Sequence, residues 1–268
     1  MTGSAPTGTL QGWRRSPFSA HGRTHDVFER GEGPGVVLIP EVPGISPEVL
    51  GFADHLVREG FTVVVPSPFG TPGRPLSTGY VLETMARLCV SSEFRAFATD
   101  VRRPITDWLR AVAIDLAGRT PGPGVAVIGM CFTGGFALAA AVEPAVLAAV
   151  MSQPGVPFPV SRARKVNGGL STEDLETVGQ RADRGELCAM GLRFSEDGIV
   201  PPERFATVKA RLGDAFEVIQ LDSSRGNPGG FSSSAHSVLT GEVREQPGHP
   251  AFEARARVVA FLRERLTA

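Results

Sequence analysis

The sequence predicts an α/β protein whose mostly parallel central sheet is covered by helices on both faces. Two observations support this prediction. Short runs that are apolar at every position recur at residues 36–39, 125–128 and 147–151, as expected for strands buried on both sides. Helical patterns separate these runs, and such alternation is typical of parallel sheets. With 268 residues, 42% of them hydrophobic and 21% charged, the chain can form one large domain.

The first 24 residues mix glycine, serine and arginine with few apolar positions. We expect residues 1–24 to form a flexible N-terminal arm and residues 25–268 to form a single α/β domain. Within that domain, residues 154–186 are rich in proline and glycine and then in charged residues. This stretch is expected to be a lid-like insertion.

Helix signals and strand runs alternate along the rest of the chain. Ser46 as N-cap and Pro47 at the first helical position begin the first helix, and Gly60 ends it. Pro66 is expected to stop the second buried strand, and Pro104 to break or kink a long helical stretch. The expected strands are 25–30 (at an edge), 36–39, 61–65, 125–128, 147–151, 187–194 and 216–221, and the later helices are 92–116, 134–141, 172–178, 202–212 and 252–266.

Composition excludes several classes of partner and site. The formal charge is −1 and the pI is about 6.5, so a nucleic-acid backbone is not an expected partner. No apolar run is long enough for a membrane span or a signal peptide. The three cysteines (Cys89, Cys131, Cys188) form no disulfide framework or zinc motif. We expect a reduced, cytoplasmic protein without a metal or organic cofactor; the sequence gives no indication of oligomeric state.

The sharpest local motif is GMCFTGG at residues 129–135, between a buried strand and a helix of small residues. This is the context of a nucleophile elbow, with Cys131 where serine is more common. The tight turn strains the nucleophile, and side chains at Gly129 or Gly134 would collide across it. The N-terminus of the following helix favours a thiolate. The alternative is that Cys131 is a small buried hydrophobic residue beside a turn.

A nucleophilic cysteine needs a base, and His236 follows the last expected strand, where elbow-type enzymes place their histidine. His249, just before the terminal helix, is the competing candidate. The remaining histidines are expected to be solvated or structural: His21, His25 and His55.

An orienting acid is expected after the strand at 187–194. Asp197 fits this turn, and Glu196 is its immediate alternative. Taken alone, Asp197 before a glycine is explained by turn chemistry. Because cysteine, aspartate and histidine each follow an expected strand, the combination favours a triad. Glu41 directly follows the first buried strand and is either a solvated loop carboxylate or a partner of the thiol.

Five segments in the expected order resemble the dienelactone hydrolase family, whose members are cysteine-dependent enzymes with the α/β-hydrolase fold. They are PEVPG at 40–44, GF and VP bounding the strand at 60–66, the Gly-x-Cys-x-x-Gly-Gly elbow at 129–135, DGIVP at 197–201 and AHS at 235–237. The resemblance extends over about residues 36–266.

This resemblance implies that Cys131 is the nucleophile, His236 the general base and Asp197 its orienter. An attacked ester or lactone would form a thioester, which water then hydrolyses. In the family, the glutamate corresponding to Glu41 contacts the resting thiol and moves when substrate binds, helping to form the thiolate.

The resemblance also implies an oxyanion hole formed by the backbone N–H groups of Val42 and Phe132. One substrate-clamping arginine of the dienelactone hydrolases lies four residues after the catalytic histidine, and here that position is Thr240. The second is matched by Arg95 or by nothing. The fold and triad are therefore expected to transfer better than the dienelactone substrate.

The sequence thus predicts a hydrolase that acts on the carboxylic ester or lactone of a small organic acid, of the carboxymethylenebutenolidase type. One alternative is a ligand-binding or regulatory module on the same fold. Another is an acyl transferase or a carbon–carbon hydrolase, since no sequence feature separates water from another acceptor.

Overall fold

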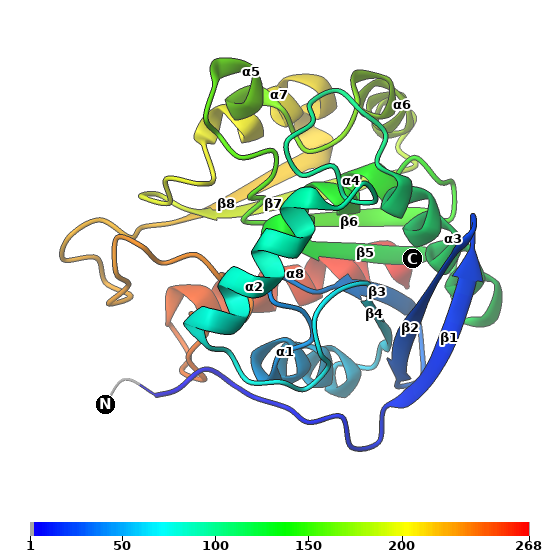
Figure 1. The fold of residues 1–268 in the computed structure, drawn as a ribbon, viewed down its shortest axis with the longest axis horizontal. Coiled ribbons are helices and arrows are strands. Elements are labelled where there is room, and N and C mark those ends of the chain that lie inside the picture. The colour runs from blue at the N-terminus through cyan, green and yellow to red at the C-terminus, as the bar shows by residue number, and fades with distance from the viewer. Residues whose placement is uncertain (1–2, 268) are drawn as a thin grey trace.

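The computed structural model describes residues 3–267, and its centre is a sheet of eight strands (Figure 1). The strand order is β1-β2-β4-β3-β5-β6-β7-β8. β2 pairs antiparallel with both β1 and β4, whereas all other neighbours are parallel. The prediction of a mostly parallel sheet between helices is confirmed. The strands are β1 (Arg14–Ala20), β2 (Arg23–Arg30), β3 (Gly35–Ile39), β4 (Thr62–Ser67), β5 (Val125–Met130), β6 (Val146–Ser152), β7 (Cys188–Phe194) and β8 (Phe216–Leu221).

Helices connect successive parallel strands and cover both faces of the sheet. They are α1 (Pro47–Arg58), α2 (Thr78–Val90), α3 (Pro104–Arg119), α4 (Gly134–Ala140), α5 (Arg162–Val166), α6 (Thr172–Asp183), α7 (Pro202–Leu212) and α8 (Pro250–Leu266), with the 3₁₀ turns η1 (Cys131–Thr133) and η2 (Gly213–Ala215). The first helix begins as predicted, with the Ser46 side chain accepting from the backbone of Val49 and Pro47 as its first residue.

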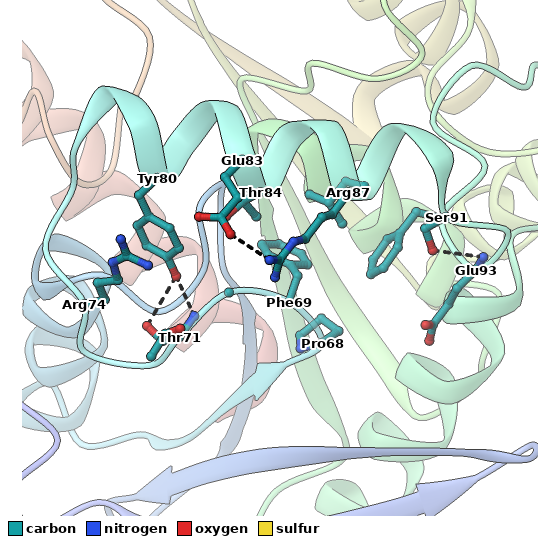
Figure 2. Close-up of a pocket in the computed structure, with 13 residues that line it drawn as sticks. Pro68, Phe69, Thr71, Arg74, Tyr80, Glu83, Thr84, Arg87, Ser91 and Glu93 are labelled. Atoms are coloured by element: carbon teal, nitrogen blue, oxygen red, sulfur yellow. Dashed lines mark hydrogen bonds and ion pairs between the residues drawn. The ribbon is translucent and has the colours of Figure 1, made fainter.

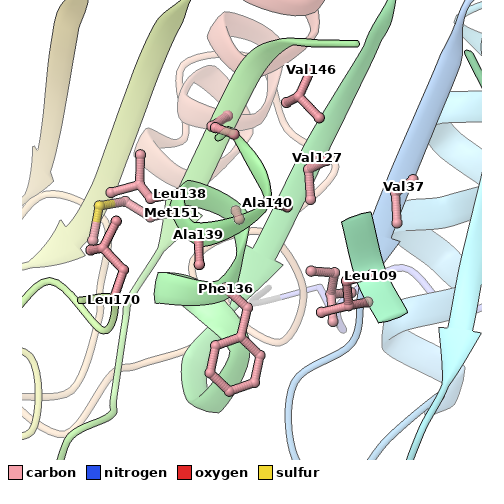
Figure 3. Packing of buried hydrophobic residues seen from close by; sticks show 14 of the residues in the cluster. Val37, Leu109, Val127, Phe136, Leu138, Ala139, Ala140, Val146, Met151 and Leu170 are labelled. Carbon is pink, nitrogen blue, oxygen red and sulfur yellow. The ribbon is translucent and has the colours of Figure 1, made fainter. Parts of the chain in front are cut away.

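The two faces of the sheet carry separate hydrophobic cores. Alternate residues of β3 point to opposite sides, so Val37 packs in one core and Val36 in the other. α3, α4, α6 and α7 contribute to the first core, part of which is shown in Figure 3, while α1 and α8 contribute to the second. Every residue of β3 and β5 is buried, which explains their uninterrupted apolar sequences.

Several sequence-based boundaries were wrong. Residues 14–20, within the expected arm, form β1, which occupies the sheet edge outside β2. β4 continues through Pro66, whose register partner is Val27 of β2. The helix expected at 92–116 has no first half: residues 91–103 are irregular, and Pro104 is the first residue of α3. Proline suits this place because the first turn of a helix needs no N–H donor. The unpredicted α2 lies just before this region.

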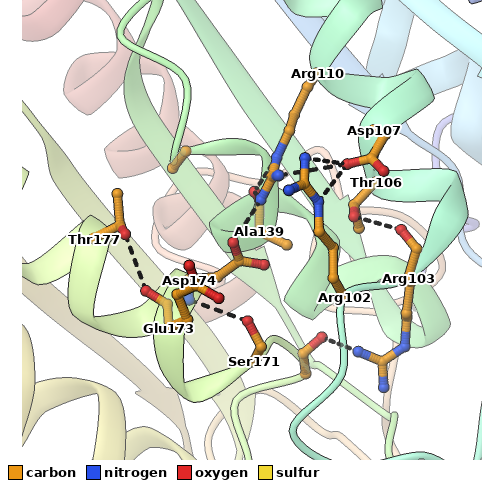
Figure 4. A network of polar contacts seen from close by, with 12 residues as sticks. Arg102, Arg103, Thr106, Asp107, Arg110, Ala139, Ser171, Glu173, Asp174 and Thr177 are labelled. Atoms are coloured by element: carbon orange, nitrogen blue, oxygen red, sulfur yellow. Dashed lines mark hydrogen bonds and ion pairs between the residues drawn. The ribbon is translucent and has the colours of Figure 1, made fainter. Parts of the chain in front are cut away.

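The segment between β6 and β7 is tied to α3 by buried polar contacts (Figure 4). Arg110 of α3 donates to the carboxylate of Asp174 in α6 at 2.9 Å and to the carbonyl of Ala139 at 2.9 and 2.6 Å. Ser171 caps α6 by accepting from the backbone of Asp174. These contacts fix α6 beside α3 and α4.

Candidate active site

The turn after β5 holds Cys131 in a conformation that side chains rarely adopt. Its φ is 52°, in the left-handed region. A Cβ at Gly129 would lie 2.3 Å from the carbonyl oxygen of Thr133, and one at Gly134 would lie 2.7 Å from the Cα of Pro154. The predicted steric need for both glycines is confirmed. Cys131 itself is half-buried, so its thiol is presented at the carboxyl end of the sheet.

Thr133 fastens this turn to the neighbouring strand. Its fully buried hydroxyl accepts from the backbone N–H of Met130 at 3.0 Å and lies 3.2 Å from the carbonyl oxygens of Ile39 and Pro40. The segment that carries Glu41 and Val42 is therefore held beside the elbow. Sequence reasoning did not single out Thr133, although a threonine two residues after the nucleophile was a usable signal.

The structure brings His236 and Asp197 together. The Nδ1 of His236 lies 2.6 Å from Oδ2 of Asp197, whose other oxygen accepts from the backbone of Ile199 at 3.1 Å. Asp197 is 7% exposed. The second imidazole nitrogen, Nε2, is buried and has no hydrogen-bond partner within residues 3–267.

The charge environment of His236 points to Cys131. Burial lowers the pKa of His236, but the charge of the Cys131 thiolate, together with the hydrogen bond and charge of Asp197, outweighs burial and raises the pKa to about 11. Protonation of His236 is therefore favoured by the two acidic groups that flank it, Cys131 and Asp197. This arrangement suits a nucleophile–base pair.

The alternative acid and base make other contacts. Glu196 is exposed, and its backbone N–H donates to Ser223. The Nε2 of His249 lies 3.2 Å from the carbonyl oxygen of Gly229, and its ring packs on Phe231. Of the two histidines considered, His236 is the one that meets Asp197.

Glu41 is buried and fully engaged by neutral donors. One carboxylate oxygen accepts from Nε2 of Gln153 at 3.1 Å and from Oγ of Ser237 at 2.8 Å. The other accepts from the hydroxyl of Thr240. Thr240, which replaces the expected arginine, therefore contacts the glutamate. Sequence reasoning missed Gln153, because nothing local marks a glutamine after a strand as part of a site.

The family model for "Dienelactone hydrolase family" matches residues 24–172. The chain belongs to this family. The match contains Glu41 and Cys131 and ends before Asp197 and His236. The protein is therefore a member of a hydrolase family and has the α/β-hydrolase fold, as the resemblance implied. No curated protein sequence matches this chain significantly.

Solved structures of dienelactone hydrolase type share the fold. A candidate dienelactone hydrolase from Klebsiella pneumoniae subsp. pneumoniae is 15% identical with a TM-score of 0.62, covering 93% of this chain and 97% of that one. A dienelactone hydrolase-like promiscuous phosphotriesterase from metagenomic libraries is 17% identical with a TM-score of 0.60, covering 97% and 99%. The dienelactone hydrolase from Anabaena variabilis is 13% identical with a TM-score of 0.58, covering 95% and 98%.

A pocket of about 300 Å³ lies between the loop after β4 and helix α2 (Figure 2). Phe69 and Phe94 line it and also contact Phe132, with ring centroids 6.3 and 5.7 Å apart. The guanidinium of Arg74 stacks over the ring of Tyr80 at 4.0 Å. The pocket thus adjoins the residue after Cys131, while the thiol is not among its lining atoms.

Two further findings concern residues 3–267 as a whole. No helix among them is both long and apolar enough to cross a membrane. They contain no group of three or more His, Cys, Asp or Glu side chains placed to hold a metal ion.

Proposed function

We propose that this member of the dienelactone hydrolase family hydrolyses the carboxylic ester or lactone of a small organic acid, with Cys131 as nucleophile, His236 as general base and Asp197 as the orienting acid. The observation that carries the proposal is the 2.6 Å contact between Asp197 and Nδ1 of His236. It leaves the buried Nε2 free for the thiol of Cys131. The raised pKa of His236 supports the same pairing.

The chemistry follows from these positions. His236 takes the proton of Cys131, and the thiolate attacks the substrate carbonyl carbon to give a tetrahedral oxyanion. Collapse breaks the C–O bond; the alcohol leaves with the proton from His236, and a thioester remains. Water then attacks the thioester while His236 accepts its proton. The second collapse releases the acid and returns the proton to the thiolate of Cys131.

The backbone N–H groups of Val42 and Phe132 are proposed to bind the oxyanion. Phe132 directly follows the nucleophile in the 3₁₀ turn η1. Val42 belongs to the loop that Thr133 holds beside that turn. Donors on two segments joined by one buried hydroxyl keep a fixed separation, which is what stabilisation of a developing charge requires.

We also propose that Glu41 promotes formation of the thiolate. Glu41 is 8% exposed and directly precedes Val42 on the proposed oxyanion loop. From this position the buried carboxylate is proposed to influence the ionisation of the Cys131 thiol. Glu41→Gln should therefore change the pH dependence of Cys131 alkylation by iodoacetamide, followed by mass spectrometry. An unchanged profile would leave Glu41 without this role.

The test of the triad uses short-chain p-nitrophenyl esters and thioesters with the wild type, Cys131→Ala and His236→Ala. We expect both variants to lose at least about 10³-fold in kcat. Cys188→Ala removes another half-buried cysteine and should keep wild-type activity. An acyl adduct on Cys131, trapped by acid quench and located by mass spectrometry, would identify the thioester. Equal turnover by all four proteins contradicts the proposal.

A further inference from the structure

Two residues other than glycine leave adjacent central strands with a positive φ. Cys131 follows β5 with φ 52°, and Gln153 follows β6 with φ 32°. Such conformations are unfavourable at a side-chain-bearing residue and persist when the surroundings require them. The strain at Cys131 belongs to the elbow. The proposed chemistry gives no reason for the strain at Gln153, where glycine would avoid it.

The side chain of Gln153 is fully buried and bonded at both ends. Its amide oxygen accepts from the hydroxyl of Ser152, and its Nε2 donates to Glu41 at 3.1 Å. Its backbone N–H donates to the carbonyl of Leu192 in β7 at 2.7 Å. Backbone and side chain are thus fixed together, and the amide N–H is directed at one carboxylate oxygen.

Glu41 connects the two segments that flank the thiol. It precedes Val42 on the proposed oxyanion loop, and it accepts from Ser237, the residue after His236, and from Thr240 on the same loop. No Lys, Arg or His side chain within residues 3–267 lies in ion-pair contact with Glu41. Uncharged donors alone therefore hold this buried carboxylate, and Gln153 is the only one of the three that comes from outside the His236 loop.

We propose that Gln153 is a positioning residue: its amide fixes the carboxylate of Glu41, which in turn fixes the His236 loop and the Val42 loop around Cys131. This inference rests on the proposed function and assigns Gln153 no contact with substrate. In this proposal the strained turn is retained because it directs the amide of Gln153 at Glu41. Leucine would fill the same space without the donor, and glycine would relieve the backbone without supplying a side chain.

The first experiment separates the amide from the strain. Kinetics with a p-nitrophenyl ester are measured for Gln153→Leu and Gln153→Gly, together with urea unfolding. We expect both variants to lose about 10- to 100-fold in kcat with KM within about twofold of wild type, because the reacting groups are misplaced while the substrate is still bound as before. Gln153→Gly should be the more stable of the two. Wild-type kcat in Gln153→Gly would show that the amide is not needed and would overturn the proposal.

The second experiment replaces the amide donor of Gln153 with a carboxyl group that can donate only when it is protonated. Gln153→Glu keeps the size of the side chain but places two carboxyl groups in contact, so one is expected to hold a proton and donate to the other as the pH falls. The kcat of Gln153→Glu relative to wild type should therefore rise towards low pH. Cys131, His236 and Asp197 face the same site, but they are present in both proteins, so their own pH dependence cancels in this ratio. A ratio that does not change with pH contradicts the role of the donor.

Thr62→Val is the matched control. Thr62 is 5% exposed, and its hydroxyl donates to the carbonyl of Gly33 at 2.8 Å at the opposite end of the sheet. This variant should lose stability with wild-type kcat and KM. If Cys131→Ala is inactive while both Gln153→Leu and Gln153→Gly behave like Thr62→Val, the positioning role fails and the triad stands. If Cys131→Ala is active, the proposed function fails with it.

Discussion

The turns before the parallel strands (the entering end) and the turns after them (the leaving end) differ in which residues adopt a positive φ. Before β3, β4 and β5 the left-handed positions are glycines: Gly33 with φ 108°, Gly60 with φ 90° and Gly122 with φ 106°. After β5 and β6 they are Cys131 and Gln153. Entering turns need only a chain reversal, which glycine makes at low steric cost. A strained side chain remains where its own chemistry is required.

The contrast is confined to the turns that follow β5 and β6. The loops after β3 and β4 still use glycine, at Gly44 and Gly70. β5 ends just before the proposed nucleophile, and β6 ends just before Gln153, whose side chain donates to Glu41. Changes at the leaving end should therefore reduce activity, whereas matched changes at the entering end should reduce stability alone.

The largest expected effect is the loss of kcat when Asp197 no longer holds the imidazole of His236. Asp197→Asn should lower kcat by about 10²- to 10⁴-fold, because the amide no longer stabilises the imidazolium or fixes its tautomer. Glu196→Gln changes the adjacent exposed acid and should leave ester hydrolysis near the wild-type rate. Steady-state kinetics of the two variants test the assignment, and the reverse ranking would make Glu196 the orienting acid.

Glycines at the two ends provide a direct comparison. Gly134→Ala places a methyl group 2.7 Å from the Cα of Pro154, so the elbow must shift. We expect a loss of about 1–3 kcal/mol in unfolding free energy and at least about tenfold in kcat. Gly33→Ala, with a methyl group 2.2 Å from the carbonyl oxygen of Gly60, should lose similar or greater stability with normal kcat. Urea unfolding and kinetics on the same preparations distinguish these outcomes.

Buried arginines extend the comparison to side chains. Arg204 is fully buried and donates to backbone carbonyls of the segment after β6, at Pro154, Pro157 and Arg164. Arg181 is 4% exposed and donates to the carbonyls of Ala141, Glu143 and Pro144 before β6.

Each arginine-to-methionine variant should lose about 2–4 kcal/mol of stability, because several carbonyl groups lose their donor. Only Arg204→Met should also change kcat or KM, since the backbone N–H of Gly155, next to Pro154, donates to the carbonyl of Cys131 at 2.8 Å. If folded Arg204→Met has normal kinetics, the buried arginines after and before β6 do not differ in their effect on activity.

The last expected effect concerns the pH dependence of stability rather than the activity. Burial opposes protonation of His236, but Cys131 and Asp197 raise its pKa above the ordinary value of 6.5. A raised pKa in the folded state stabilises fully below the unfolded pKa, and this contribution is lost as pH rises through the folded value. The unfolding free energy should therefore fall from about pH 6.5, the unfolded value, to about pH 11, the folded value. His236→Gln should flatten this decline, and an equally steep decline would exclude His236 as its source.

Much of the fold could be predicted because its signals are local. Continuous apolar runs identify β3 and β5, since both faces of these strands are buried. Missed elements depend on partners. β1 has a half-exposed polar sequence and is joined to β2 by exposed ion pairs, Arg14 with Glu29 and Arg15 with Asp26. In α2 the buried residues Tyr80, Thr84 and Leu88 recur every four positions, and the Ser77 cap was an overlooked signal.

The sequence by itself determined the elbow, because the sterics of its glycines act over a few residues. It also determined the carboxyl-end placement of Cys131, Asp197 and His236, since each follows a strand. Only the tertiary structure decided that His236 rather than His249 meets Asp197, and that Gln153 and Thr240 hold Glu41. These contacts join residues from 39 to 199 positions apart. Their geometry depends on how the strands pack side by side, and no local pattern encodes it.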